Sequence, residues 1–130
     1  MIARPYTPEQ HGILSEWWSA HGWTPVHPSL LPANGYIIWE GLQPLASGFL
    51  YLTDSKFCVM EWVLSNPKSD RIERGKALDL LLDSLLQCAK DNGNKMIFSS
   101  IKHPKLLERY KAHGFLATDE QMTSMIGRIE

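Results

Sequence analysis

Apolar and polar positions follow two different periods on either side of Pro67. Residues 57–64 read Phe-Cys-Val-Met-Glu-Trp-Val-Leu, a run rich in β-branched and aromatic side chains that predicts a strand. From Ala77 the period becomes helical. One apolar stripe then follows the spacing i, i+3, i+4, i+7 and i+11, at Leu78, Leu81, Leu82, Leu85 and Ala89. The pattern therefore predicts a strand followed by an amphipathic helix that lies on a sheet.

Between this strand and this helix we expect a charged loop, residues 68–76. It reads Lys-Ser-Asp-Arg-Ile-Glu-Arg-Gly-Lys, so four cations outnumber two carboxylates. Free N–H groups and the positive end of the helix dipole meet at a helix start, and a glycine lets an anion approach the main chain. The loop is therefore a candidate site for a phosphate group.

The first half of the chain predicts a strand, a helix, a loop and a three-stranded meander. Thr7 and Pro8 are typical of a helix start, and Gly22 ends that helix. Residues 23–32, called here the proline loop, hold three prolines among large apolar residues and predict a structured loop with room for one helical turn. Gly48 marks a bulge in the meander. The strands expected here are residues 2–4, 35–40, 45–52 and 57–64.

The second half predicts a fifth strand at residues 95–100, a short helix and a closing hairpin. A strand, helix, strand order of this length favours a parallel pair with a right-handed crossover. The short helix runs from His103 to about His113, and the hairpin consists of residues 115–117 and 122–129. The predicted fold class is α+β, one layered sandwich over residues 1–130 with a mixed sheet.

Composition and charge narrow the expected location and partners. No basic-plus-apolar leader and no bilayer-length apolar run is present, so we expect a cytoplasmic protein without a membrane partner. Cys58 and Cys88 lack metal-like spacing and are expected to be reduced core residues, although the sequence leaves their pairing open. The formal net charge of -1 gives no broad positive field that would attract nucleic acid. Only the cations of the charged loop would favour nucleic-acid binding.

Two further classes of site find no support in the sequence. The five histidines are dispersed, with no HExxH motif and no Cys/His cluster, so no metal is expected. No Gly-x-Ser-x-Gly elbow occurs, and neither cysteine has an activating neighbourhood. Covalent catalysis by a nucleophilic side chain is therefore not expected.

Two stretches resemble the GNAT family, the acyl-CoA-dependent N-acetyltransferases. Residues 61–67 (Glu-Trp-Val-Leu-Ser-Asn-Pro) with residues 75–81 (Gly-Lys-Ala-Leu-Asp-Leu-Leu) are similar to the family's central strand, pyrophosphate loop and following helix. Residues 103–115 are similar to its late helix, which holds a tyrosine and ends in Gly-Phe. The resemblance covers essentially the whole chain and implies about seven mostly antiparallel strands flanked by about four helices. Residues 17–32 also resemble small GNAT-like proteins of phages.

The charged loop departs from the family pattern of Arg or Gln, two residues, Gly, one residue, and Gly or Ala. Without gaps, Asp70, Glu73 and Gly75 fill the three key positions. A shift of two residues places Ile72, Gly75 and Ala77 there and loses the leading cation. A glutamate facing a diphosphate would cost on the order of a kcal/mol unless a neighbouring arginine neutralised it.

The resemblance implies transfer of an acetyl group from acetyl-CoA to a primary amine by direct attack. Tyr110 stands at the general-acid position and would protonate the leaving thiolate; the alternative is that it packs beside Leu106 and Leu107. Glu61 is the expected base, directly or through water, with a pKa raised by partial burial. The alternative is that Glu61 faces solvent or pairs with a nearby cation.

The resemblance also implies two sets of binding residues. Main-chain groups of Val63 and Leu64 would pair with the pantetheine arm, and an N–H near Val63 would stabilise developing oxygen charge. The loop cations would hold the phosphates, unless they are simply solvated. The expected cofactor-binding residues are Val63, Leu64, Arg71, Arg74, Gly75, Lys76, Ala77 and His103, and the expected acceptor-binding residues are Trp23, His27 and Leu31.

A second hypothesis comes from another functional class. The chain would then be a catalytically inactive GNAT-like fold that acts as an interaction or structural protein. Glu73 in the charged loop and the missing leading cation favour this hypothesis. For the enzyme, the expected partner is an amine acceptor, either a small molecule or a protein, and a homodimer stays open.

Overall fold

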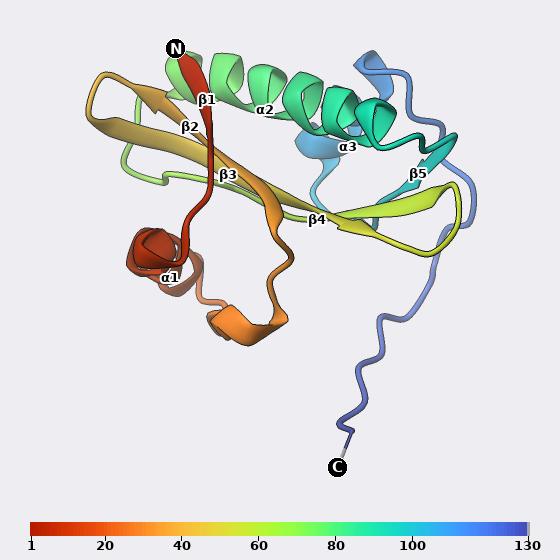
Figure 1. Ribbon diagram of the computed structural model, residues 1–130. Coiled ribbons are helices and arrows are strands. Elements are labelled where there is room, and N and C mark those ends of the chain that lie inside the picture. Colours follow the sequence, from red (N-terminus) through yellow and green to blue (C-terminus); the bar gives the residue numbers. More distant parts are fainter. Residues whose placement is uncertain (130) are drawn as a thin grey trace. The chain divides into compact units, whose positions relative to one another are not determined.

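A mixed sheet of five strands is the frame of the first of two units into which the chain divides, residues 1–100 and the part that follows. The computed structural model describes residues 1–129. The first four strands are antiparallel and the fifth is parallel to the fourth (Figure 1). In spatial order they are β1 (Ile2–Pro5), β2 (Asn34–Glu40), β3 (Gln43–Leu52), β4 (Phe57–Ser65) and β5 (Met96–Phe98).

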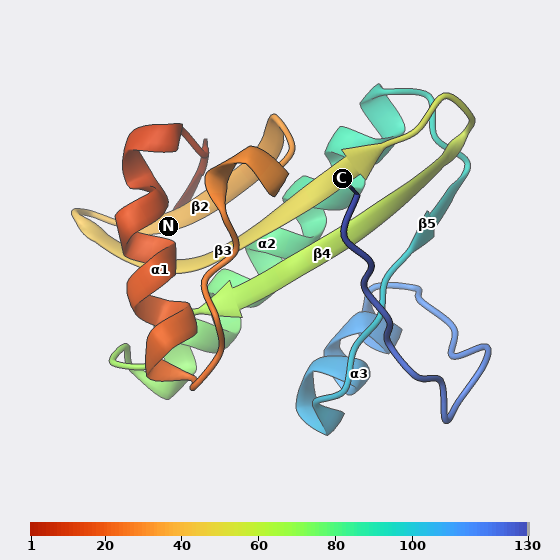
Figure 2. The ribbon, with the colours of Figure 1, turned by 90° about the horizontal axis from the view of Figure 1, so that it is seen from below.

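One helix packs on each face of this sheet (Figures 1 and 2). Helix α1 (His11–Ala20) follows a 3-10 turn, η1 (Pro8–Gln10), and buries its apolar residues with those of three strands: Leu14, Trp17, Trp18, Ile37, Phe49 and Leu64. Helix α2 (Arg71–Asp91) covers the other face with Ala77, Leu81, Leu82 and Leu85. Each large side chain buried in this way contributes roughly 1.5–3 kcal/mol.

The proline loop connects α1 to β2 on the α1 face of the sheet (Figure 2). It contains one 3-10 turn, η2 (Pro28–Leu30), as the sequence predicts. Gly22, with φ of +77°, ends α1 just before it because a left-handed backbone favours glycine.

A bulge interrupts the pairing of β3 with β4 at the predicted glycine. Phe49 pairs with Glu61 and Ser47 with Leu64, so Gly48 stands opposite two residues, Trp62 and Val63, called here the β4 bulge. Gly48 also lies against α2, where an added Cβ would come within 3.1 Å of Leu85 Cδ1 and 3.2 Å of Leu81 Cδ2. A larger residue here would require these leucine side chains to shift by a few tenths of an ångström, so glycine suits the close approach of α2.

The strands β4 and β5 form the parallel pair that the sequence predicts, but they stay together for only three residue pairs. Phe57 pairs with Met96 and Val59 with Phe98, and the ladder then ends. Within residues 1–129 the rest of β4 has no partner strand on that side. The main chain of β4 therefore has an open edge beyond Val59.

The second unit contains one helix, α3 (Pro104–Ala112), close to its predicted limits. Gly114, with φ of +94°, ends it. The rings of Tyr110 and Phe115 then pack together with their centroids 5.1 Å apart.

Three features differ from the expectation. The described residues hold five strands and three α-helices, not seven and four. Residues 115–129 form no strand; Leu116 and Ile126 are 87% and 93% exposed, and a hairpin that buries no apolar face is at best marginally stable. Helix α2 begins at Arg71, not Ala77, because Asp70 caps it, and a good cap offsets the cost of about 1 kcal/mol for Gly75 in a helix.

Gly35 gives a direct test of the packing between sheet and α1. An added Cβ would lie 2.4 Å from Cδ1 of the fully buried Phe49. We expect Gly35→Ala to lower the free energy of unfolding by about 1–3 kcal/mol in urea titrations. Gly12→Ala is the control, because nothing lies within 4 Å of that Cβ. Equal unfolding midpoints for the two variants would contradict the packing described.

Candidate functional site

The open edge of β4 carries one ionisable side chain, Glu61. Its carboxylate is half-buried and accepts the N–H of Ser100 through Oε1 at 3.2 Å. Burial raises the pKa of Glu61 above its usual 4.5, and the Ser100 hydrogen bond opposes that rise. A carboxylate with a raised pKa at an open strand edge is suited to accept a proton from a bound group.

The two residues after Trp62 direct their side chains to opposite faces of the sheet, with Val63 partly buried and Leu64 buried. Cγ2 of Val63 lies toward Gly48 and the α2 face, and Leu64 is 3% exposed in the cluster with α1. A ligand at the open edge therefore meets main-chain groups here, which bind without regard to side-chain identity.

The start of α2 is capped by the chain itself. Oδ2 of Asp70 accepts the N–H groups of Ile72 at 3.0 Å and Glu73 at 3.1 Å. The predicted loop with converging free amides is thus a helix whose first donors bond to a carboxylate. The Glu73 carboxylate is not inserted there and lies 3.7 Å from Nζ of Lys76. An external anion would have to compete with Asp70.

The predicted phosphate-binding cations lie on the first turns of α2. Arg71 and Lys76 are exposed, while Nη1 of Arg74 donates to the carbonyl of Pro67 at 3.4 Å. Gly75 is partly buried, and Ala77 is fully buried against the sheet. The side chain of Ala77 therefore belongs to the core.

The three predicted acceptor-binding residues have separate surroundings. Trp23 is 55% exposed and stacks on His21, with ring centroids 4.8 Å apart. His27 caps η2, since its Nδ1 accepts the N–H of Ser29 at 3.1 Å. Leu31 packs against the core beneath α1. Trp23 and His27 are both exposed, whereas Leu31 is partly buried, so the two rings are the members of this set that a ligand could reach.

Two aromatic residues near Glu61 were not singled out from the sequence. Nε1–H of Trp62 donates to Oη of Tyr51 at 2.7 Å, and that hydroxyl donates to the carbonyl of Leu30 at 2.7 Å. Burial raises the pKa of Tyr51, the Trp62 hydrogen bond lowers it, and the charge of Glu61 adds to the rise. Strand alternation could have placed Tyr51 on the α1 face, but its partner depends on the bulge.

Two predicted site residues belong to the second unit. Tyr110 packs on Phe115, and His103 caps α3 because its Nδ1 accepts the N–H of Lys105 at 3.2 Å. An imidazole therefore serves here as the acceptor that a helix start needs.

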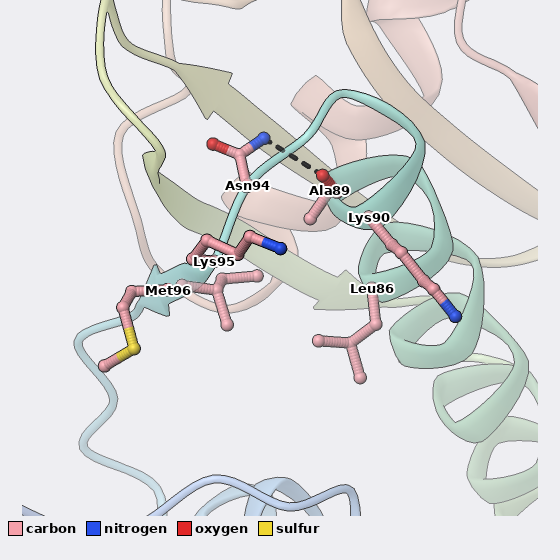
Figure 3. Close-up of a pocket in the computed structure, with 7 residues that line it drawn as sticks. Leu86, Ala89, Lys90, Asn94, Lys95 and Met96 are labelled. Carbon is pink, nitrogen blue, oxygen red and sulfur yellow. Dashed lines mark hydrogen bonds between the residues drawn. The ribbon is translucent and has the colours of Figure 1, made fainter.

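None of the predicted site residues lines either of two cavities of the first unit. One of about 140 Å³ lies at the end of α2 and the start of β5, next to the hydrogen bond from Nδ2 of Asn94 to the Ala89 carbonyl (Figure 3). A groove of about 320 Å³ separates α1 from the chain leaving β4. Among residues 1–129 no group of His, Cys, Asp and Glu is arranged for a metal ion. No helix of the described chain has the length and hydropathy to cross a membrane.

Burial of Glu61 has a measurable effect on stability. A pKa raised on folding means that the folded chain binds the proton more tightly, so stability falls as the pH rises through the raised value. Glu61→Gln cannot ionise and keeps an acceptor oxygen for Ser100. We expect it to be more stable than the wild type above that pKa, with the advantage vanishing below pH 4.5 in urea titrations. An advantage that persisted in acid would contradict this.

No protein-family model and no curated protein matches this chain. Solved structures do. Wild-type TTHA1254 from Thermus thermophilus is 18% identical with a TM-score of 0.75 over 100% of both chains. Rv2747 from Mycobacterium tuberculosis, in complex with CoA, is 13% identical with a TM-score of 0.72 over 95% of this chain and 76% of that one.

A GNAT-family acetyltransferase structure from Novosphingobium aromaticivorans is also similar. It is 12% identical with a TM-score of 0.69, over 89% of this chain and 52% of that one. Identities this low show the fold alone. The chain has a GNAT-like fold, which confirms the fold resemblance noted in its sequence.

Proposed function

We propose that this chain transfers an acetyl group from acetyl-CoA to a primary amine. The observation that carries the proposal is the open edge of β4 beyond Val59, where the β4 bulge and the partly buried Glu61 lie together. The GNAT-like fold, shared with a structure that holds CoA, supports the same reaction class.

The open edge fits the arm of acetyl-CoA. Main-chain donors and acceptors of an unpaired strand suit an extended ligand that carries amide groups, in the manner of an added strand. The fit at α2 is less complete. Arg71 and Lys76 offer exposed charge there, but the diphosphate must displace the Asp70 carboxylate from two N–H groups or bind beside it.

Each residue has a separate chemical role in the proposal. Bound acetyl-CoA would supply the activated thioester. The ionised carboxylate of Glu61 takes the proton that the amine must lose, directly or through a water molecule. Its raised pKa makes this carboxylate a stronger base than an ordinary glutamate. A main-chain N–H near Val63 donates to the carbonyl oxygen as negative charge develops. We assign the proton for the departing sulfur to the Tyr110 hydroxyl.

The capped start of α2 favours a second candidate function. If Asp70 holds its two N–H groups against a diphosphate, the fold loses its main phosphate anchor. The chain would then be a GNAT-like interaction or structural protein. Binding of acetyl-CoA separates the two functions.

Glu61→Gln tests the proposed reaction. Calorimetry should give a dissociation constant on the order of micromolar for acetyl-CoA with both wild type and variant. Release of the CoA thiol in the presence of a panel of primary amines should be about 10²- to 10⁴-fold slower in the variant. Glu16→Gln, at an exposed residue of α1, is the matched control and should keep wild-type rates. No heat and no thermal shift at millimolar ligand would favour the second function.

Asp70→Asn tests the competition at the start of α2. An amide oxygen can keep the cap, and the like charge is removed. We therefore expect the variant to bind acetyl-CoA about two- to fivefold more tightly by calorimetry, the factor given by a charge near a helix start. Asp54→Asn, in the exposed turn before β4, controls for the change in net charge. Equal affinities of Asp70→Asn and wild type would mean that the diphosphate does not approach these N–H groups.

A further inference from the structure

Three residues form a hydrogen-bonded chain that joins β4, β3 and the proline loop. The indole of Trp62 donates to the Tyr51 hydroxyl, and that hydroxyl donates to the carbonyl of Leu30, each at 2.7 Å. Trp62 belongs to the β4 bulge, Tyr51 to β3 and Leu30 to η2. The Tyr51 hydroxyl thus uses both its acceptor and its donor capacity to hold two separate elements.

The backbone of Trp62 is in an unfavourable conformation for its type. Its φ is +60°, in the left-handed region that disfavours bulky side chains. A glycine at this position would avoid the strain but would have no indole to reach Tyr51. The hydrogen bond to Tyr51 therefore keeps in place a conformation that the backbone alone disfavours.

The proline loop needs such external support. Its prolines have no N–H to donate, and Leu30 is 59% exposed. Nε2 of His11 lies 2.7 Å from the carbonyl of Val26 and holds the loop near its centre. The bond from Tyr51 to Leu30 holds it close to its end. Glu61 belongs to the same face of the sheet, since it pairs with Phe49 of the core beneath α1.

We propose that Tyr51 is a positioning residue, whose hydroxyl fixes the proline loop to the β4 bulge so that the loop forms a wall of the amine site beside Glu61. This inference rests on the proposed acetyl transfer for its catalytic consequence. Tyr51 itself does not touch the reacting atoms in this scheme. It acts through Trp62 and Leu30, which set the shape of the acceptor side.

Tyr51→Phe removes both hydrogen bonds and keeps the ring. We expect the KM for the amine to rise about three- to tenfold, the factor for loss of one or two such bonds, with kcat and the affinity for acetyl-CoA within about twofold. Tyr36→Phe makes the same change on β2, near Cys88 of α2, and should leave the amine KM unchanged. The double variant Trp62→Phe/Tyr51→Phe should raise the amine KM by less, in free-energy terms, than the sum of the two single substitutions, because both remove the same hydrogen bond.

Hydrogen exchange tests the clamp without reference to turnover. The amides of Leu30 and Leu31 bond to the carbonyls of His27 and Pro28 within η2, so their exchange reports the order of the loop. Both should exchange several-fold faster in Tyr51→Phe, with the α2 amides unchanged. Unchanged exchange and unchanged amine KM would overturn the proposal. If the wild type transferred no acetyl group, the exchange rates of Leu30 and Leu31 would still support or overturn the clamp itself.

Discussion

Gly48 pairs with two residues of β4 where a regular ladder would give it one, and the arrangement of both faces depends on this mismatch. One extra residue moves every later side chain of a strand to the other face. As a result Val63 lies toward α2 and Leu64 completes the core beneath α1. The missing Cβ lets Leu81 and Leu85 of α2 approach β3 closely. The bulge thus sets the direction of β4 in the part of the strand that no longer pairs with β5.

The start of α2 favours negative charge, which either a ligand or the chain itself can supply. Unpaired N–H groups and the helix dipole attract negative charge, whether it belongs to a ligand or to the chain. In this structure the charge is the carboxylate of Asp70. An acetyltransferase needs a diphosphate to bind beside or in place of it, whereas an interaction protein does not. The same contact therefore bears on both stability and function.

Several polar residues that resemble ligands in the sequence have structural roles in the fold. His27 and His103 each accept an N–H at a helix start, a role that aspartate or serine more often has. Tyr51 and Trp62 attract no notice in a list of motifs, yet their hydrogen bonds join three elements near Glu61. What distinguishes the two groups is the position of their partners, which lie two residues away for the histidines and in other elements for the aromatic pair.

By itself the sequence determined the features that depend on near neighbours along the chain. The run of β-branched and aromatic residues predicted β4, leucine spacing predicted most of α2, and Gly48 predicted the bulge, because each reflects local backbone preference or periodicity. Only the tertiary structure decided that α2 starts at Arg71, that β4 parts from β5 after Val59, and that residues 115–129 form no strand. These outcomes depend on caps, ladder partners and burial against distant segments, and the free energy of such contacts is not encoded in any short stretch of residues.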